Sequence, residues 1–118
     1  MTRVFVSYAR RDERWALAAA RHLRARGIDA WLDLDSAASA EPVLAEIAAA
    51  IRTSAAVVWV ARRDTPVSYW VGLELSLATS MGRPIRALDP DCGVKLRDQV
   101  LDTCAVIAGL RSQATPQA

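Results

Sequence analysis

Hydrophobic and polar positions follow two different periods along the chain, and the two periods alternate. Short apolar or β-branched runs predict strands, and longer segments with an apolar residue every three or four positions predict helices. Such an alternating order is typical of a parallel sheet with helices on both faces. Five strands are predicted, at Arg3–Tyr8, Ile28–Leu34, Ala55–Val60, Pro84–Leu88 and Thr103–Ile107.

The helices between these strands have recognisable ends. Asp12 is expected to cap a helix that Gly27 terminates, and Pro42 suits the first position of a helix that runs to Arg52. A short helix is expected at Val94–Leu101. With right-handed crossovers, this order predicts a flavodoxin-like, doubly wound α/β fold with strand order 2-1-3-4-5. Its ligand crevice opens at the carboxyl ends of strands one and three.

The stretch Ser68–Met81 has the strongest helical pattern in the chain. Ser68 can cap its N-terminus, and Gly82 follows its end. Glu74 is the one charged residue in the stretch, and it interrupts the apolar stripe. A carboxylate in that position needs a partner, so we expect either a salt bridge, a wet edge or a functional site. The apolar face is predicted to consist of Trp70, Leu73, Leu77 and Met81.

Composition limits the classes of protein that this chain can be. Its 118 residues suit one domain, expected at 1–111, with a tail or the start of a linker at 112–118. A net charge of +2 with scattered arginines does not favour a nucleic-acid partner. No apolar run is long enough for a membrane helix, and the start shows no signal peptide, so a cytoplasmic protein is expected. Two separated cysteines and one histidine predict free thiols and no metal site.

Several common uses of such a fold do not match the residues at the predicted crevice. The five glycines are dispersed, so there is no dinucleotide fingerprint, and there is no Walker loop. Strand one ends in Ser7 and Tyr8 rather than in the acidic pair of a phosphate receiver. The single histidine, His22, cannot build a catalytic triad with any serine, and we interpret it as a half-exposed structural residue.

Three motifs in the right order resemble Toll/interleukin-1 receptor (TIR) domains. Val4–Tyr8 followed by Arg11 and Asp12 is similar to their first box, and Gly27–Asp33 is similar to their second strand. Ser68-Tyr69-Trp70 with Glu74-Leu75 resembles the S-x-W-x-x-x-E-L helix of TIR domains that cleave NAD⁺. The resemblance extends over Arg3–Leu88, which is most of the chain.

The resemblance implies which residues form the site. Glu74 matches the catalytic glutamate, and Trp70 matches the aromatic residue of the nicotinamide and ribose pocket. NAD⁺ is then a substrate, and no cofactor is implied. The alternative interpretation of Trp70 is core filling, and that of Arg10 and Arg11 is a solvated loop. The substrate site is predicted to include Trp70, Ser7, Tyr8, Ala9, Arg10 and Arg11.

The chemistry is reasonable with a single carboxylate. Cleavage of a ribosyl bond passes through an oxocarbenium-like state, and glycosidases use two carboxyl groups because the leaving oxygen needs a proton. Nicotinamide leaves NAD⁺ as a neutral pyridine and needs none. Glu74 can therefore stabilise the developing cation or activate water, and Trp70 can offer a flat surface to the pyridinium. Arg10 or Arg11 can bind the diphosphate.

Three classes of function are considered for this chain. The first is an NAD⁺ nucleosidase, in the setting of bacterial defence against phage, that releases nicotinamide and ADP-ribose or its cyclised form. The second is a non-catalytic TIR–TIR interaction module; a flavodoxin-like cofactor carrier is a third, but the chain lacks a phosphate loop. The short crevice loops supply no lid, so we expect copies to assemble head to tail, or another TIR-containing or activating protein to align them. The contact is expected at Glu41 and Pro42, in or beside a second loop at 35–41 that lacks the family's usual glycine.

Overall fold

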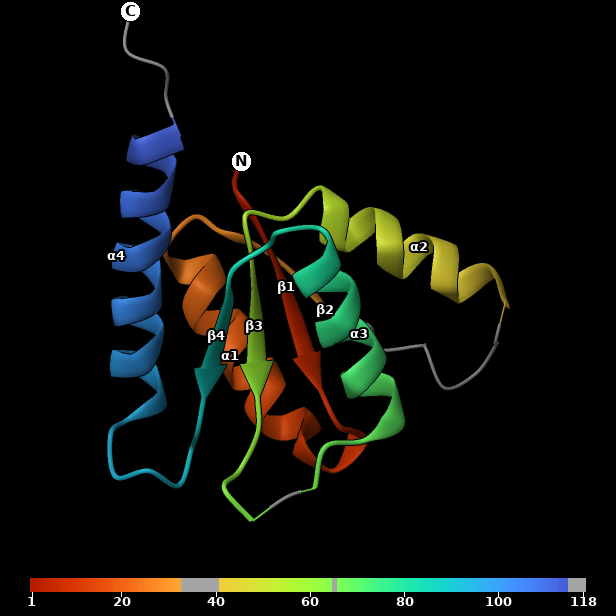
Figure 1. Ribbon diagram of the computed structural model, residues 1–118. Coiled ribbons are helices and arrows are strands. Elements are labelled where there is room, and N and C mark those ends of the chain that lie inside the picture. Colours follow the sequence, from red (N-terminus) through yellow and green to blue (C-terminus); the bar gives the residue numbers. More distant parts are fainter. Residues whose placement is uncertain (33–40, 65, 115–118) are drawn as a thin grey trace, which may run out of the picture.

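The computed structural model describes residues 1–32, 41–64 and 66–114, and it describes side chains from residue 44 to residue 110 in the last two segments. Strands and helices alternate through them as the hydrophobic pattern predicts (Figure 1). In chain order the elements are β1 (Arg3–Tyr8), the single 3-10 turn η1 (Arg10–Asp12), α1 (Glu13–Ala25), β2 (Asp29–Leu32), α2 (Glu41–Arg52), β3 (Ala56–Val60), α3 (Tyr69–Ser80), β4 (Ile85–Leu88) and α4 (Leu96–Ala114).

The sheet in the described part of the chain has four parallel strands in the order β2-β1-β3-β4. This order confirms the first four positions of the predicted 2-1-3-4-5 topology, with β2 at an edge and β3 inside the sheet. In the register of the two central strands, Ser7 lies opposite Trp59 and Tyr8 lies opposite Val60. The carboxyl ends of β1 and β3 therefore meet at one end of the sheet, where the sequence predicts the crevice.

The prediction of a fifth strand is wrong. Thr103–Ile107 lies inside α4, a single helix of 19 residues that also contains most of the short helix expected at Val94–Leu101. The β-branched residues of this stretch favour a strand, but Val100, Thr103 and Ile107 are the buried ones, at spacings of three and four. That spacing is helical, and packing of this face against α1 and β4 overrides the local strand preference.

Two helices cover each face of the sheet (Figure 1). Val4 and Val6 point to the face of α1 and α4, and Phe5 points to the face of α2 and α3, as the alternation of a strand requires. Phe5 stacks on Trp31 of the edge strand, with ring centres 5.1 Å apart. The sheet is thus a layer between two apolar clusters, and the residues of β1 contribute to both.

The ends of α1 agree only in part with the predicted signals. Gly27 follows the helix with a φ of 78°, a left-handed conformation that glycine adopts at little cost, so the predicted stop is confirmed. Asp12 occupies the N-cap position, but its side chain makes no capping hydrogen bond, so the predicted role of its carboxylate is wrong. The carboxylate is instead turned inward and is 1% exposed.

Four further expectations from the sequence can be compared with the described residues. None of the helices in the described segments combines the length and apolar character needed to cross a bilayer. Among the described residues, no three His, Cys, Asp or Glu side chains lie close enough to share a metal ion. Both cysteines are free thiols, and burial raises the pKa of Cys104. The tail expected at 112–118 begins within α4, and its last four residues lie outside the described segments.

Candidate active site at the carboxyl end of the sheet

Helix α3 presents Glu74 to the sheet. Ser68 caps the helix, since its hydroxyl accepts a hydrogen bond from the backbone N–H of Val71 at 3.1 Å, as predicted. Glu74 lies in the second turn and is 2% exposed. The most deeply buried face is Val71, Glu74 and Ala78, rather than the predicted stripe through Trp70 and Leu77. Because the helix is apolar nearly all round, its pattern does not specify which face packs deepest.

The carboxylate of Glu74 meets the side chain of Ser7. The Ser7 hydroxyl donates a hydrogen bond of 2.7 Å to Oε1 of Glu74, and both side chains are buried. Ser7 can reach it because it shares with Phe5 the face of β1 that α3 covers. A short hydrogen bond from a hydroxyl to a carboxylate is stronger than one between neutral groups. This contact joins the end of β1 to the second turn of α3.

Trp70 lies one turn before Glu74, in the first turn of α3. Its ring is half-buried and packs against the cluster on the α2 and α3 face, whose buried members include Phe5 and Ile51. Trp70 therefore combines a packed side with an exposed portion. Core filling and a role in binding are both compatible with this position.

The other residues predicted for the substrate site do not share one surface. Tyr8 follows Ser7 along β1, so it points to the opposite face and packs against the cluster beneath α1. Ala9 is buried, and its carbonyl accepts a hydrogen bond from the backbone N–H of Asp12. Arg10 and Arg11 are exposed at the start of η1, whose third residue, Asp12, is buried. The structure brings Ser7 to Glu74 directly, and it leaves the two arginines at the rim.

A small cavity lies between the carboxyl ends of β1 and β3. Its volume of about 10 Å³ is the space that one water molecule needs. Asp12 is one of the residues that line it, and neither oxygen of its buried carboxylate accepts a hydrogen bond from a described residue. Trp59, which the pattern places in a central strand, also lines the cavity and is only partly buried. Sequence reasoning did not include Trp59 in the site. Its position near the end of β3, opposite Ser7, indicates that it belongs there, but only once the strand register is known.

Two side chains fix the loops at this end of the sheet. Arg62, after β3, forms an ion pair of 2.9 Å with Asp91, and the hydrogen bond and charge of Asp91 raise the pKa of Arg62. The side-chain amide of Gln99 in α4 forms two hydrogen bonds with the backbone of Asp89. Its oxygen accepts from the Asp89 N–H at 2.9 Å, and its nitrogen donates to the Asp89 carbonyl at 2.8 Å. The loop after β4 is therefore tied to the loop after β3.

The predicted contact residues begin α2. Glu41 and Pro42 are its first two positions, but their side chains lie outside the part of the chain that the structure describes. The second loop at 35–41 also lies outside it, apart from the backbone of Glu41. The assembly contact therefore stays a prediction.

Comparisons with known proteins agree on the fold. The family model described as "TIR domain" matches residues 4–101. No curated protein matches the chain. The TIR domains of the activated Roq1 resistosome, which directly recognises the pathogen effector XopQ, align with a TM-score of 0.61 at 18% identity, over 97% of this chain and 75% of that one. A 2-desoxiribosyltransferase from Leishmania mexicana aligns with a TM-score of 0.62 at 14% identity, over 77% of this chain. The present chain spans 66% of that enzyme's length.

Proposed function

This chain belongs to the TIR domain family, and from that premise we propose that it is an NAD⁺ nucleosidase with Glu74 as its catalytic carboxylate. The observation that carries the proposal is the buried contact between Ser7 and Oε1 of Glu74 at the carboxyl end of the sheet. Open parallel sheets bind their ligands at this end. Trp70 one turn earlier supplies an aromatic surface beside the same position. We place the enzyme in the bacterial cytoplasm, in defence against phage.

The proposed reaction breaks the bond between the ribose C1′ and the nicotinamide nitrogen. The electron pair of that bond stays on the nicotinamide, which leaves as a neutral molecule and needs no proton from the protein. The ribose develops positive charge, and a preorganised carboxylate in a site shielded from bulk water stabilises such charge more strongly than it does in solution. Water then bonds to C1′ and loses one proton, which Glu74 accepts, or which passes to solvent water where Glu74 only orients the attacking molecule. The products are nicotinamide and ADP-ribose; attack by the adenine in place of water gives the cyclised form.

The neighbouring residues have distinct roles in this proposal. Ser7 holds the carboxylate through its hydroxyl, so we assign it the role of positioning Glu74, in place of the substrate contact that the family resemblance implies. The exposed portion of Trp70 stacks against the pyridinium ring, a contact worth on the order of 1 kcal/mol. Arg10 and Arg11 at the rim bind the diphosphate through charged hydrogen bonds.

The substitution Glu74→Gln tests the catalytic role. Glutamine keeps the size of the side chain and removes its charge, and the loss of one preorganised electrostatic group lowers the rate by about 100-fold or more. We would incubate purified protein at high concentration with NAD⁺ and separate nicotinamide and ADP-ribose by chromatography. Glu46→Gln on the exposed surface of α2 is the matched control and keeps the wild-type rate.

Two results would contradict the assignment. A Glu74→Gln protein that melts as wild type and cleaves NAD⁺ at the wild-type rate excludes Glu74 as the catalytic group. A wild-type protein that folds, assembles and never cleaves NAD⁺ supports the alternative, in which the domain only associates with other TIR domains. Circular dichroism of both variants separates loss of chemistry from loss of fold.

Burial of Glu74 motivates the second part of the proposal, which is assembly. At 2% exposure the carboxylate is closed to a substrate, so the side chains around it have to move before NAD⁺ can bind. A second copy that docks head to tail at the start of α2 can supply both the energy for this rearrangement and the missing cover over the crevice. A contact of this type does not close on itself and forms open filaments.

A dilution series tests the assembly. Specific activity per mole of protein rises with concentration, together with the mass seen by light scattering, because the active form contains more than one copy. Reversing the charge of Glu41 lowers activity at high concentration and leaves the melting temperature unchanged. If specific activity stays constant from nanomolar to high micromolar protein and the mass stays monomeric, the assembly is refuted while the role of Glu74 stands.

A further inference from the structure

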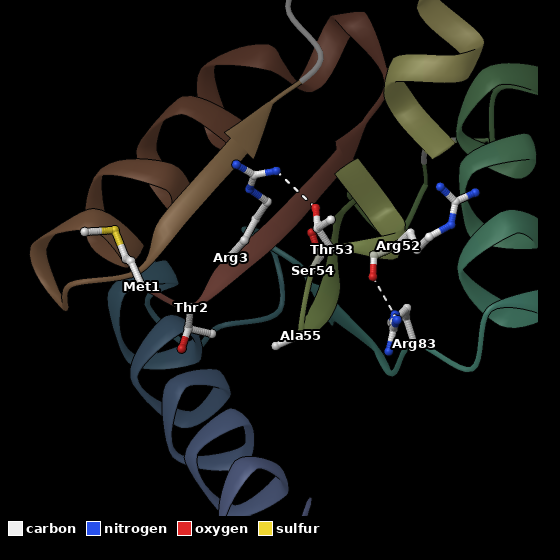
Figure 2. Close-up of a pocket in the computed structure, with 8 residues that line it drawn as sticks. All are labelled: Met1, Thr2, Arg3, Arg52, Thr53, Ser54, Ala55 and Arg83. Atoms are coloured by element: carbon white, nitrogen blue, oxygen red, sulfur yellow. Dashed lines mark hydrogen bonds between the residues drawn. The ribbon is translucent and has the colours of Figure 1, made fainter. Parts of the chain in front are cut away.

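A second concave site lies at the opposite end of the sheet, beside the amino ends of β1 and β3. It is an open hollow of about 370 Å³ (Figure 2). Arg3 begins β1, Arg52 ends α2, and Arg83 precedes β4, so three separate elements each bring one arginine to it. Nothing in the proposed reaction uses this end of the molecule. The lining residues are Met1, Thr2, Arg3, Arg52, Thr53, Ser54, Ala55 and Arg83.

The charge of this arginine hollow is unbalanced. None of its lining residues is acidic, and the nearest compensating carboxylate is Asp29, which pairs with Nε of Arg3 at 3.1 Å. Arg52 and Arg83 form no ion pair with a carboxylate of the described residues. Three arginines with one paired carboxylate leave an excess of two positive charges on the residues that line the hollow, and opposite charges attract. An anion in the hollow balances that excess.

Hydrogen bonds hold two of the guanidinium groups in place. Arg3 donates to the hydroxyl of Thr53 at 3.1 Å, and Arg83 donates to the backbone carbonyl of Arg52 at 2.8 Å. Figure 2 shows these two side chains on either side of the segment 53–55. Arg52 extends away from Arg3 in the same view and is exposed, so rotation about its side-chain bonds can bring it to a ligand. Arg3 and Arg83, by contrast, are already held by hydrogen bonds, so they lose little conformational freedom when they bind a ligand.

The end of α2 does not oppose an anion here, although a helix C-terminus carries partial negative charge. Each of its last carbonyl groups already accepts a hydrogen bond. Ala49 accepts from Thr53, Ala50 accepts from the Ser54 hydroxyl at 2.6 Å, and Ile51 accepts from the Ser54 N–H. The carbonyl of Arg52 accepts from Arg83. With these oxygens occupied, the arginine charges determine the potential in the hollow.

We propose that the arginine hollow binds the phosphate group of a small anionic ligand. A phosphate offers more acceptor oxygens and more charge than a carboxylate, and the planar fork of arginine pairs with two phosphate oxygens at once. The hollow has the volume of a small-molecule site, so it can hold a phosphate ester larger than the free ion. This site is independent of NAD⁺ cleavage at the other end of the sheet.

The test is a titration of the full chain with inorganic pyrophosphate and, separately, with ADP at constant ionic strength. Binding is followed by NMR of the arginine Nε–H groups and of the backbone amides. We expect saturable shifts at Arg3, Arg83 and the segment 53–55. Equal affinity for the two probes identifies phosphate alone as the recognised group, and tighter binding of ADP adds the nucleoside.

Two variants distinguish the hollow from general attraction to a basic protein. Arg52→Gln weakens pyrophosphate binding by about tenfold, because a charged hydrogen bond is lost while the capped end of α2 stays intact. Arg21→Gln, an exposed arginine on α1, leaves the affinity unchanged. The proposal is overturned if no shift saturates by about 10 mM pyrophosphate, if the shifts occur only near η1, or if the two variants weaken binding equally.

Discussion

Replacing Ser7 with alanine tests the contact that holds Glu74 against the sheet. The substitution removes one hydroxyl and leaves Glu74 buried with one donor fewer. A hydrogen bond to a charged group contributes about 1.5–3 kcal/mol to the free energy of unfolding. For a chain of 118 residues, 1 kcal/mol corresponds to roughly 4 °C in melting temperature, so Ser7→Ala is expected to lower it by about 6–12 °C.

A double-mutant cycle shows whether the charge of Glu74 carries this effect. In the Glu74→Gln background the lost bond joins two neutral groups, so Ser7→Ala costs only about 1 kcal/mol. The assay is urea unfolding of the wild type, the two single variants and the double variant, with tryptophan fluorescence as the signal. Ser76→Ala, at an exposed position of α3, is the control and changes stability by less than about 0.5 kcal/mol.

The NAD⁺ assay adds a second measurement to the same variant. If Ser7 positions the catalytic carboxylate, Ser7→Ala lowers kcat by about 10-fold or more and leaves KM nearly unchanged, because the hydroxyl then binds the carboxylate and not the substrate. The reasoning is refuted if Ser7→Ala is as mild as Ser76→Ala in urea. It is also refuted if the effect is the same in the presence and absence of the Glu74 charge.

Two further predictions concern packing. Ile107→Ala costs about 2–5 kcal/mol, since Ile107 is 3% exposed in α4, whereas Leu110→Ala, at 37% exposure on the same helix, costs well under half of that; equal urea midpoints for the two would contradict this packing of α4. Trp70→Ala removes NAD⁺ cleavage but costs less stability than Phe5→Ala, because Trp70 is half-buried and Phe5 is fully buried. Equal losses in thermal melts with no separate loss of activity would make Trp70 a core residue.

The local signals in the sequence predict the elements that have clear ends. The Ser68 cap, the glycine after α1 and the apolar run of β3 each specify their element without help from the rest of the chain. The region after β4 differs, because Thr103–Ile107 has strand-forming residues and helical spacing at once. Tertiary packing decides between the two preferences, and a local pattern does not contain that information.

The candidate site could be predicted as residue types but not as contacts. Glu74 is visible in the sequence as a charge in an apolar helix, yet its partner is 67 residues away. Strand alternation places Ser7 and Tyr8 on opposite faces, so of the two neighbours only Ser7 can meet α3. Choosing between them requires knowing which helices cover which face. The Asp12 carboxylate shows the same limit, because its sequence position suggests a cap while its conformation turns it into the protein.

The position of α4 affects the order in which this domain can complete its fold during synthesis. Among the described elements α4 leaves the ribosome last, and it supplies Val100 and Ile107 to the cluster on the α1 face. Until α4 is synthesised, it cannot cover the face of β3 and β4 that also carries α1. By then α2 and α3 can already cover the opposite face of the sheet. A nascent chain therefore exposes an apolar surface for a few seconds, at the usual rate of about 5–20 residues per second. One face of the sheet can mature while the other is still open to chaperones.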